Sequence, residues 1–179
     1  SKKLENWKFS SSKHLKKYDS TNSGKDISID RYGDEYTLCF VNGQIALESL
    51  NKFIYKDDMN ILDIDELNNE TTCSTSSNFE KEALFHLGLS TIKSGKYFEF
   101  KEGSKFDTPI QILNFYSKET EALRISSFNI FKLNSGNNIS IVEKDLNEGS
   151  GSFNLSLNKF ICGDDAILNH SILYDDNTE

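Results

Sequence analysis

The chain has 179 residues, a formal net charge of -8 and a pI near 5.0, which argues against a general phosphate-binding surface because nucleic-acid binders concentrate Lys and Arg. Its composition, 36% hydrophobic and 12% aromatic, supplies a folded core and excludes disorder along the whole length. No stretch approaches the roughly 18 apolar residues that cross a bilayer, and the first residues lack a signal-peptide pattern. We therefore expect a cytoplasmic protein with neither nucleic acid nor membrane as a partner.

Residues 1–95 predict a mixed α/β cap region. Apolar side chains recur with helical spacing in residues 1–18 and 78–93, and a Ser/Thr/Asn-rich loop at 68–77 precedes the second helix. Strands are predicted at 27–32, 36–41 and 44–47, and residues 61–67 predict a strand that enters a helical turn.

Asn42-Gly43 stands between the second and third of these strands. This dipeptide between two apolar runs is the strongest short signal for a β-hairpin, because both residues tolerate the positive φ angles of a type I′ turn. We predict a hairpin with its turn at these two residues.

Residues 96–179 predict repeated strands. Three segments align on Gly103, Gly136 and Gly163, each with an apolar residue three positions before the glycine and another three after it. The two offsets are 33 and 27 residues. Further strands are predicted within these intervals, at 109–116, 139–143 and 153–160.

Units of this length predict a mainly β fold, with the cap region at 1–95 followed by the first rungs of a right-handed parallel β-helix at 96–179. A sandwich of hairpins is the main alternative, since the turns at 101–105 and 134–138 suit either topology. In a β-helix the strand near 167–173 presents an open edge and an apolar end, so we expect a larger parent domain and self-association through the open solenoid end.

The candidate chemical residues favour structural roles. Three cysteines without a C-x-x-C pair indicate neither a disulfide framework nor a zinc knuckle, and we expect Cys39 and Cys162 to be buried and Cys73 to be an exposed thiol. The three histidines, His14, His86 and His170, form no local metal motif. For His86 we expect a packing role, and for His170 the weaker hypothesis is a place on the surface near an interface.

Paired acids at 57–58, 164–165 and 175–176 are typical of solvated turns and do not predict calcium binding. A β-helix enzyme that acts on acidic polysaccharide would need clustered carboxylates with a neighbouring base. The only arginines, Arg31 and Arg124, accompany no acidic cluster. We expect no catalytic, cofactor-binding or metal-binding residue, and we keep a self-contained solenoid interaction module as the alternative function.

Six short motifs, in order and covering nearly the whole chain, resemble the SufB/SufD family of iron–sulfur cluster assembly scaffold proteins. They are ENWKFS at 5–10, FVNG at 40–43, the helix from Ala83-Leu84 to Gly95, PIQIL at 109–113, ISIVE at 139–143 and GDDAILNH at 163–170. The short distance between the first two motifs is closer to the SufD branch than to the SufB branch.

This resemblance implies a non-enzymatic scaffold subunit that works in a complex with SufB and the ATPase SufC, with the cluster assembled transiently by the complex. Family members are usually more than twice as long, and the resemblance places the SufC contact in a C-terminal helical domain. The cysteine and histidine implicated in cluster formation match no position here. The resemblance therefore assigns no functional residue and no cofactor to these 179 residues.

Overall fold

The structure is a computed structural model that describes residues 34–67, 92, 94–117, 124–147 and 153–173. The predicted helices at 1–18 and 78–93 lie outside these residues apart from Ile92, and so do the strand at 27–32 and the loop at 68–77. Within the described part, no helix has the length and apolar character that a membrane crossing needs.

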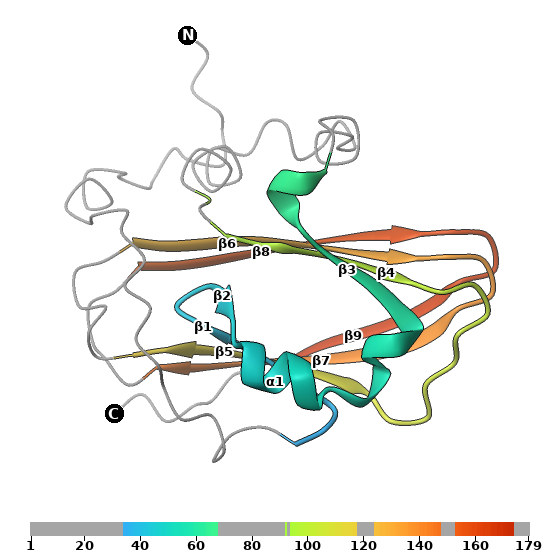
Figure 1. Cartoon of the computed structure of the whole chain (residues 1–179), viewed down its shortest axis with the longest axis horizontal. Coiled ribbons are helices and arrows are strands. Elements are labelled where there is room, and N and C mark those ends of the chain that lie inside the picture. Colours follow the sequence, from blue (N-terminus) through green and yellow to red (C-terminus); the bar gives the residue numbers. More distant parts are fainter. Residues whose placement is uncertain (1–33, 68–91, 93, 118–123, 148–152, 174–179) are drawn as a thin grey trace, which may run out of the picture.

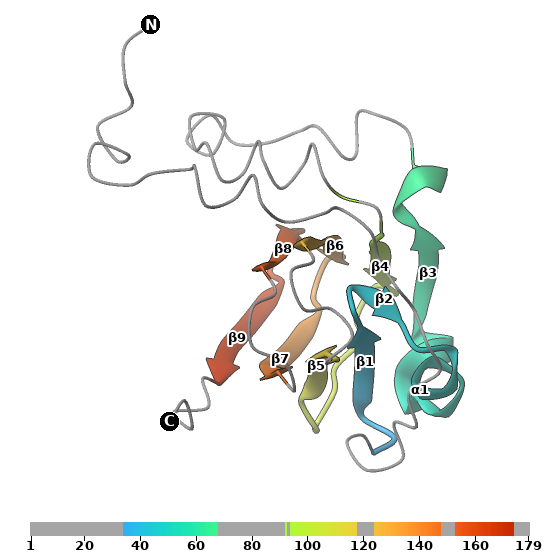
Figure 2. The same cartoon turned by 90° about the vertical axis from the view of Figure 1, so that its left-hand side faces the viewer.

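The described elements form two sheets that face each other as two layers (Figures 1 and 2). One sheet has the order β2-β1-β5-β7-β9, and the other has the order β3-β4-β6-β8. The elements are β1 (Thr37–Val41), β2 (Gln44–Ile45), α1 (Leu47–Lys52), the 3-10 helix η4 (Ile54–Asp58), β3 (Met59–Asp63), the 3-10 helix η5 (Ile64–Glu66), β4 (Lys96–Phe100), β5 (Ile110–Tyr116), β6 (Arg124–Leu133), β7 (Asn138–Asn147), β8 (Phe153–Cys162) and β9 (Ile167–Leu173).

From β4 onward, successive strands alternate between the two sheets, and every strand pair formed among β4 to β9 is parallel. A sandwich of hairpins would pair consecutive strands antiparallel, so that alternative is wrong for this part of the chain. The prediction of a mainly β fold is confirmed, with parallel sheets. The predicted turn from strand to helix at 61–67 is also confirmed, because β3 runs directly into η5.

The predicted hairpin is confirmed at Asn42-Gly43. β1 and β2 pair antiparallel around this turn, and the two residues have φ angles of 50° and 83°. Asn42 is only 1% exposed, and its side chain exchanges hydrogen bonds with Ser117 at 3.2 and 3.1 Å. On the other side, the Ser94 hydroxyl donates to the Gly43 carbonyl at 2.7 Å. The hairpin tip is therefore fixed to residues that flank both sheets.

One half of the space between the sheets is a packed apolar core. Because paired strands keep a constant register, Phe98, Phe131 and Phe160 lie one above another, with ring centroids 4.9 and 5.4 Å apart. The aliphatic rows of the opposite sheet face this stack, and stacked aromatic rings add to the free energy gained from burial alone. The fully buried side chains of this core include Leu38, Phe40, Phe100, Ile110, Ile112, Leu133, Ile139 and Ile141.

The turns that follow β4, β6 and β8 have one shape, and they correct the predicted repeat. Gly103 and Gly136 both have positive φ, at 74° and 71°, and their spacing of 33 residues is as predicted. In the next turn the equivalent residue is Asp165 with φ 57°, because Leu133 pairs with Cys162. The predicted match of Gly136 to Gly163 is therefore two residues out of register. Aspartate is one of the few residues besides glycine that enter this region readily.

Gly95 marks the closest approach of two backbones. A Cβ atom built on this residue would lie 1.8 Å from the carbonyl oxygen of Phe128, on the neighbouring strand β6. The adjacent Ser94 carbonyl accepts a hydrogen bond from the Phe128 amide at 3.1 Å, so the two strands cannot separate without losing this bond.

We therefore predict that Gly95→Ala lowers the free energy of unfolding by roughly 3 kcal/mol, in the range of severe backbone and overpacking effects. The matched control is Gly103→Ala. Its Cβ would meet nothing within 4 Å, and its cost of about 1–2 kcal/mol comes from the positive φ angle alone. Urea unfolding followed by circular dichroism measures both variants, and equal losses would contradict the steric explanation.

Candidate functional site

Away from the 101–104 and 134–137 turns, the space between the sheets changes from apolar to polar. On strand β6, the two inward positions that precede Phe131 are Asn129 and Ser127. They pair in register with Asn158 and Ser156 of β8. Amides and hydroxyls that face inward need hydrogen-bond partners, because burial without them is costly.

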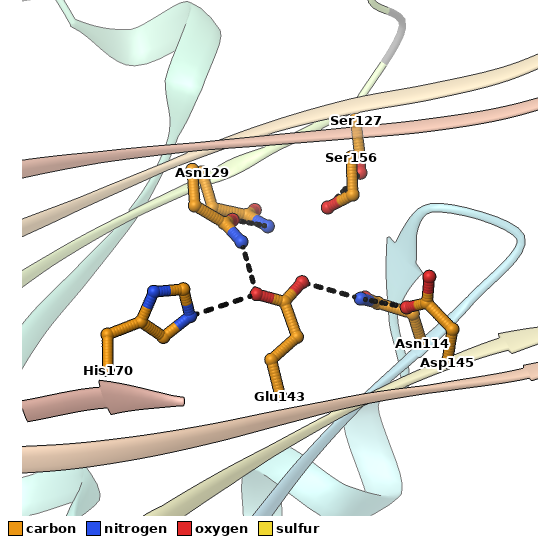
Figure 3. Close-up of polar contacts among 8 residues, drawn as sticks. Asn114, Ser127, Asn129, Glu143, Asp145, Ser156 and His170 are labelled. Atoms are coloured by element: carbon orange, nitrogen blue, oxygen red, sulfur yellow. Dashed lines mark hydrogen bonds and ion pairs between the residues drawn. The ribbon is translucent and has the colours of Figure 1, made fainter. Parts of the chain in front are cut away.

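A buried carboxylate, Glu143 of β7, lies at the centre of this polar half (Figure 3). Its side chain is 7% exposed. Asn114 of β5 donates to Oε1 at 2.8 Å, and Asn158 of β8 donates to Oε2 at 2.8 Å. His170 of β9 lies 3.2 Å from Oε2 through its Nε2 atom. We call Asn114, Glu143, Asp145, Asn158 and His170 the Glu143 cluster.

The parallel register explains why these residues meet. Asn114 of β5 pairs with Asp145 of β7, and its amide donates to both Asp145, at 2.9 Å, and Glu143. In the opposite sheet, Asn129 donates to Asn158 at 3.2 Å, and Asn158 passes a hydrogen bond on to Glu143. Glu143 therefore joins β5, β7, β8 and β9, which belong to both sheets.

The Glu143 cluster contains two carboxylates and no Lys or Arg. Burial raises the pKa of Asp145, the Asn114 hydrogen bond lowers it, and the negative charge of Glu143 raises it further. The pKa of the Tyr116 hydroxyl is also raised, chiefly by burial and then by the charges of Asp145 and Glu143. This end of the interior is therefore electronegative, and amides in place of cations stabilise its charge.

Chemically, the cluster can hold a charge and orient an imidazole. Asn114, Asn158 and His170 occupy the acceptor positions of Glu143, so the carboxylate is satisfied by the protein itself. A carboxylate can only accept, so the Nε2 atom of His170 carries the proton in this contact. Hydrogen bonds to a charged group contribute about 1.5–3 kcal/mol each. The first role of the cluster is to hold four strands together.

The structure answers the predictions for two of the cysteines. Cys39 is fully buried, as predicted, and burial raises the pKa of its thiol to about 12, so the thiol is protonated at neutral pH. Cys162 is exposed, so its predicted burial is wrong. It shares the inward row with the buried Leu133, but β8 is the last strand of its sheet and no described strand covers it. Cys73 lies outside the described residues.

Of the histidines, only His170 is described, and its hydrogen bond to Glu143 places it in the cluster and not on the outer surface. His14, His86, Arg31 and the acids at 175–176 lie outside the described residues. Asp57 and Asp58 end η4, and Asp164 and Asp165 form a turn. Among the described residues, no group of three or more His, Cys, Asp or Glu side chains could hold a metal ion.

Sequence reasoning missed Glu143, although a signal was present. Ile139, Ile141 and Glu143 are alternate residues of one strand and therefore face the same side. A charged residue in an otherwise buried row predicts either a functional group or a satisfied buried charge. Its partners come from residues 114, 158 and 170, and their proximity depends on the strand register.

Two comparisons with known proteins identify no relative. A scan against models of protein families finds no match, and a search of curated proteins finds none. The resemblance to the SufB/SufD family therefore depends on the six motifs in the sequence.

We predict that Asp145→Asn stabilises the protein at neutral pH. A carboxyl whose pKa is raised on folding disfavours the folded state wherever it is ionised, so the native stability rises as the pH falls through the folded pKa. Asparagine removes this penalty and keeps an oxygen that can accept from Asn114. Urea unfolding at several pH values should give the variant a higher free energy of unfolding than the unchanged protein at pH 7. This difference should shrink below the folded pKa of Asp145.

The control for this prediction is Asp107→Asn, which removes the same charge outside the cluster. Both aspartates are exposed overall, so the two variants differ in the Asn114 hydrogen bond and the neighbouring Glu143 charge, which only Asp145 has. The same gain in both variants would indicate a general effect of net charge. A stability difference for Asp145→Asn that stays constant with pH would contradict the assignment.

Proposed function

We propose that the chain is a non-catalytic scaffold subunit of the SufD type in iron–sulfur cluster assembly, working in the cytoplasm with SufB and the ATPase SufC. In this proposal residues 1–95 are the cap region and residues 96–179 begin a right-handed parallel β-helix. The iron–sulfur cluster is assembled transiently by the complex and is not a resident cofactor of this chain.

The observation that carries the proposal is the regular alternation of strands between two parallel sheets. Residues that lie one above another are 29 to 33 positions apart, as in the pairs Glu99 and Lys132, Asn114 and Asp145, and Asn129 and Asn158. A β-helix requires this arrangement, because each coil must cover the inward row of the preceding coil. A spacing confined to 29–33 residues supports a solenoid over an irregular pair of sheets.

The motifs that resemble the family also coincide with structural elements. FVNG forms the β1–β2 hairpin, and PIQIL leads into β5. ISIVE lies in β7, and GDDAILNH forms the last turn and most of β9. Short motifs that fall on strands and turns in this order support a shared architecture.

A non-catalytic role is supported by the Glu143 cluster. Its carboxylate, which is the most deeply buried charge in the cluster, is engaged by side chains of the protein. Such a network stabilises a stack of coils without any substrate. The alternative of a self-contained solenoid interaction module shares this architecture but needs neither SufB nor SufC.

The proposal predicts a complex with defined partners. The complete natural gene product that contains this sequence should co-purify with SufB and SufC from the same organism when the three are co-expressed. Residues 1–179 alone should not retain SufC, because the resemblance places the SufC contact in a C-terminal helical domain.

Affinity purification followed by size-exclusion chromatography tests both statements. A natural gene product that purifies without SufB and SufC would favour the interaction module. Retention of SufC by residues 1–179 would contradict the proposed division of the chain.

Self-association through the open end of the stack is part of the proposal. β8 and β9 are the last strands of their sheets in the described part of the chain, and an unpaired strand edge can pair with another chain. The exposed apolar side chains of β9 are Ile167, Ile172 and Leu173, at 54%, 46% and 52% exposure. Strand addition would cover part of this surface.

We therefore expect the 179-residue chain to form dimers at high concentration. The expected result is a mass that rises with protein concentration in light scattering coupled to size-exclusion chromatography. Ile172→Lys, which places a charge on the edge strand, should lower the dimer fraction, whereas Leu62→Lys on β3 is the matched exposed control. A strict monomer at all concentrations would contradict this part of the proposal.

A further inference from the structure

We propose that residues 1–18 of this chain bind as a basic amphipathic helix in a groove between the β1–β2 hairpin and η5, with Trp7 as the apolar anchor. We call this groove the β2–η5 groove. The interaction joins two parts of one chain, so it does not depend on the partners proposed above.

The groove lies where the parallel stacking of strands stops. In the described part of the chain, β2 and β3 end their two sheets on the side of the molecule opposite β8 and β9 (Figure 2). Both pair antiparallel with their neighbours, whereas the next strand pairs along each sheet are parallel. The groove beside them has a volume of about 500 Å³. The end of a solenoid stack needs a cap that covers its apolar interior.

One part of the groove wall is apolar. Leu47 is 69% exposed although it is a large aliphatic side chain at the start of α1. It lines the groove together with the other apolar residues Phe40, Ile45, Ile64 and Ile92. Exposed apolar surface beside polar residues is typical of an interaction site.

The rest of the wall is acidic. Its charged residues are Asp63, Asp65, Glu66 and Lys96. The Lys96 amine already pairs with Asp63 at 2.6 Å. Asp65 and Glu66 are exposed, and no lysine, arginine or histidine of the described residues forms an ion pair with either of them. The groove therefore suits a segment that combines apolar side chains with positive charge.

Residues 1–18 have this combination. They contain six lysines and a single acid, Glu5, in a chain whose net charge is -8. With helical spacing, the apolar residues Leu4, Trp7, Leu15 and Tyr18 share one face. Lys3 and Lys8 border this face on its two sides, so they can reach acids at the rim of a groove that holds Trp7. Tryptophan is among the residues that most often anchor an interface.

Charge and chain length favour this segment over the one that is next to the groove in the sequence. Residues 68–91 contain three glutamates and one lysine, which would place like charges against Asp65 and Glu66. The described chain begins at Asp34, and the 15 residues 19–33 can span up to about 50 Å when extended. That reach exceeds the roughly 17 Å length of β1, which separates Asp34 from the hairpin.

Trp7 is the only tryptophan of the chain, so its fluorescence reports the docking directly. In the 179-residue chain we expect emission at short wavelength and protection from quenching by acrylamide. Leu47→Lys places a cation in the groove and should shift the emission to longer wavelength and increase the quenching. The matched control is Ile54→Lys, at a 48% exposed residue of η4 outside the groove, and it should leave both signals unchanged.

A charge swap tests the ionic part of the interaction. Asp65→Lys/Glu66→Lys should expose Trp7, because it reverses the charge of the rim. Adding Lys3→Glu/Lys8→Glu to this variant should restore the protection. The control pair Asp57→Lys/Asp58→Lys makes the same change on η4, away from the groove, and should have no effect.

Circular dichroism checks that each variant is folded. Full quenching of Trp7 in the unchanged chain would overturn the proposal. Protection that survives both Leu47→Lys and Asp65→Lys/Glu66→Lys would also overturn it, because Trp7 would then be buried elsewhere. Protection that is lost on dilution would show that the segment of a second copy fills the groove, which contradicts docking within one chain.

Discussion

The constant parallel register of the strands is the constraint on which the rest of the structure depends. It places Phe98, Phe131 and Phe160 in one stack and the aliphatic rows of the other sheet opposite them. The register survives only if the turns between strands have the same shape, and a positive φ angle recurs at Gly103, Gly136 and Asp165. Turn conformation and core packing are therefore two consequences of one geometric requirement.

The same register makes a buried charge possible. A carboxylate in the interior needs donors on neighbouring strands, and a parallel sheet supplies them from the strands on either side. Glu143 receives Asn114 from one side and His170 from the other, while Asn158 reaches it from the opposite sheet. Asp145 shares the amide of Asn114, which concentrates negative charge in a region where burial already raises the pKa of its carboxyl group. Amides take the place of counter-ions in this half of the interior.

Features set by short-range chemistry were predictable from the sequence. Asn42-Gly43 specifies its hairpin because two adjacent residues with positive φ fit few other structures. The strand alternation in β5 and β7 was visible in the same way. The turn at 163–166 was misaligned because Asp165, and not Gly163, takes the left-handed conformation. A search for glycines alone cannot find such a position.

Features that depend on long-range register were not predictable. Cys162 occupies an inward position, and it is exposed because no strand in the described part of the chain covers β8 on that side. Glu143 was visible as a charge in an apolar row, but its partners lie 15 to 29 residues away in the sequence. Their identity depends on offsets of 29 and 31 residues between paired strands, and the predicted repeat gave 27 residues in place of 29 between β6 and β8. An error of two residues shifts every predicted pairing partner to the next position on the same face of the strand.

The contrast between inner and outer strands shows how far each strand is buried by its neighbours in the sheet. Phe98 and Phe131 are fully buried, whereas Phe160 of β8 is only partly buried although it continues the same stack. Ile141 is 1% exposed because β5 and β9 flank it, while Ile172 on β9 is 46% exposed. The residue types of β8 and β9, the outermost strands in the described part of the chain, thus match those of the covered strands, and only their position differs. The inward side chains of these two strands therefore have the chemistry of an interior surface, which is stabilised when another strand covers it in register.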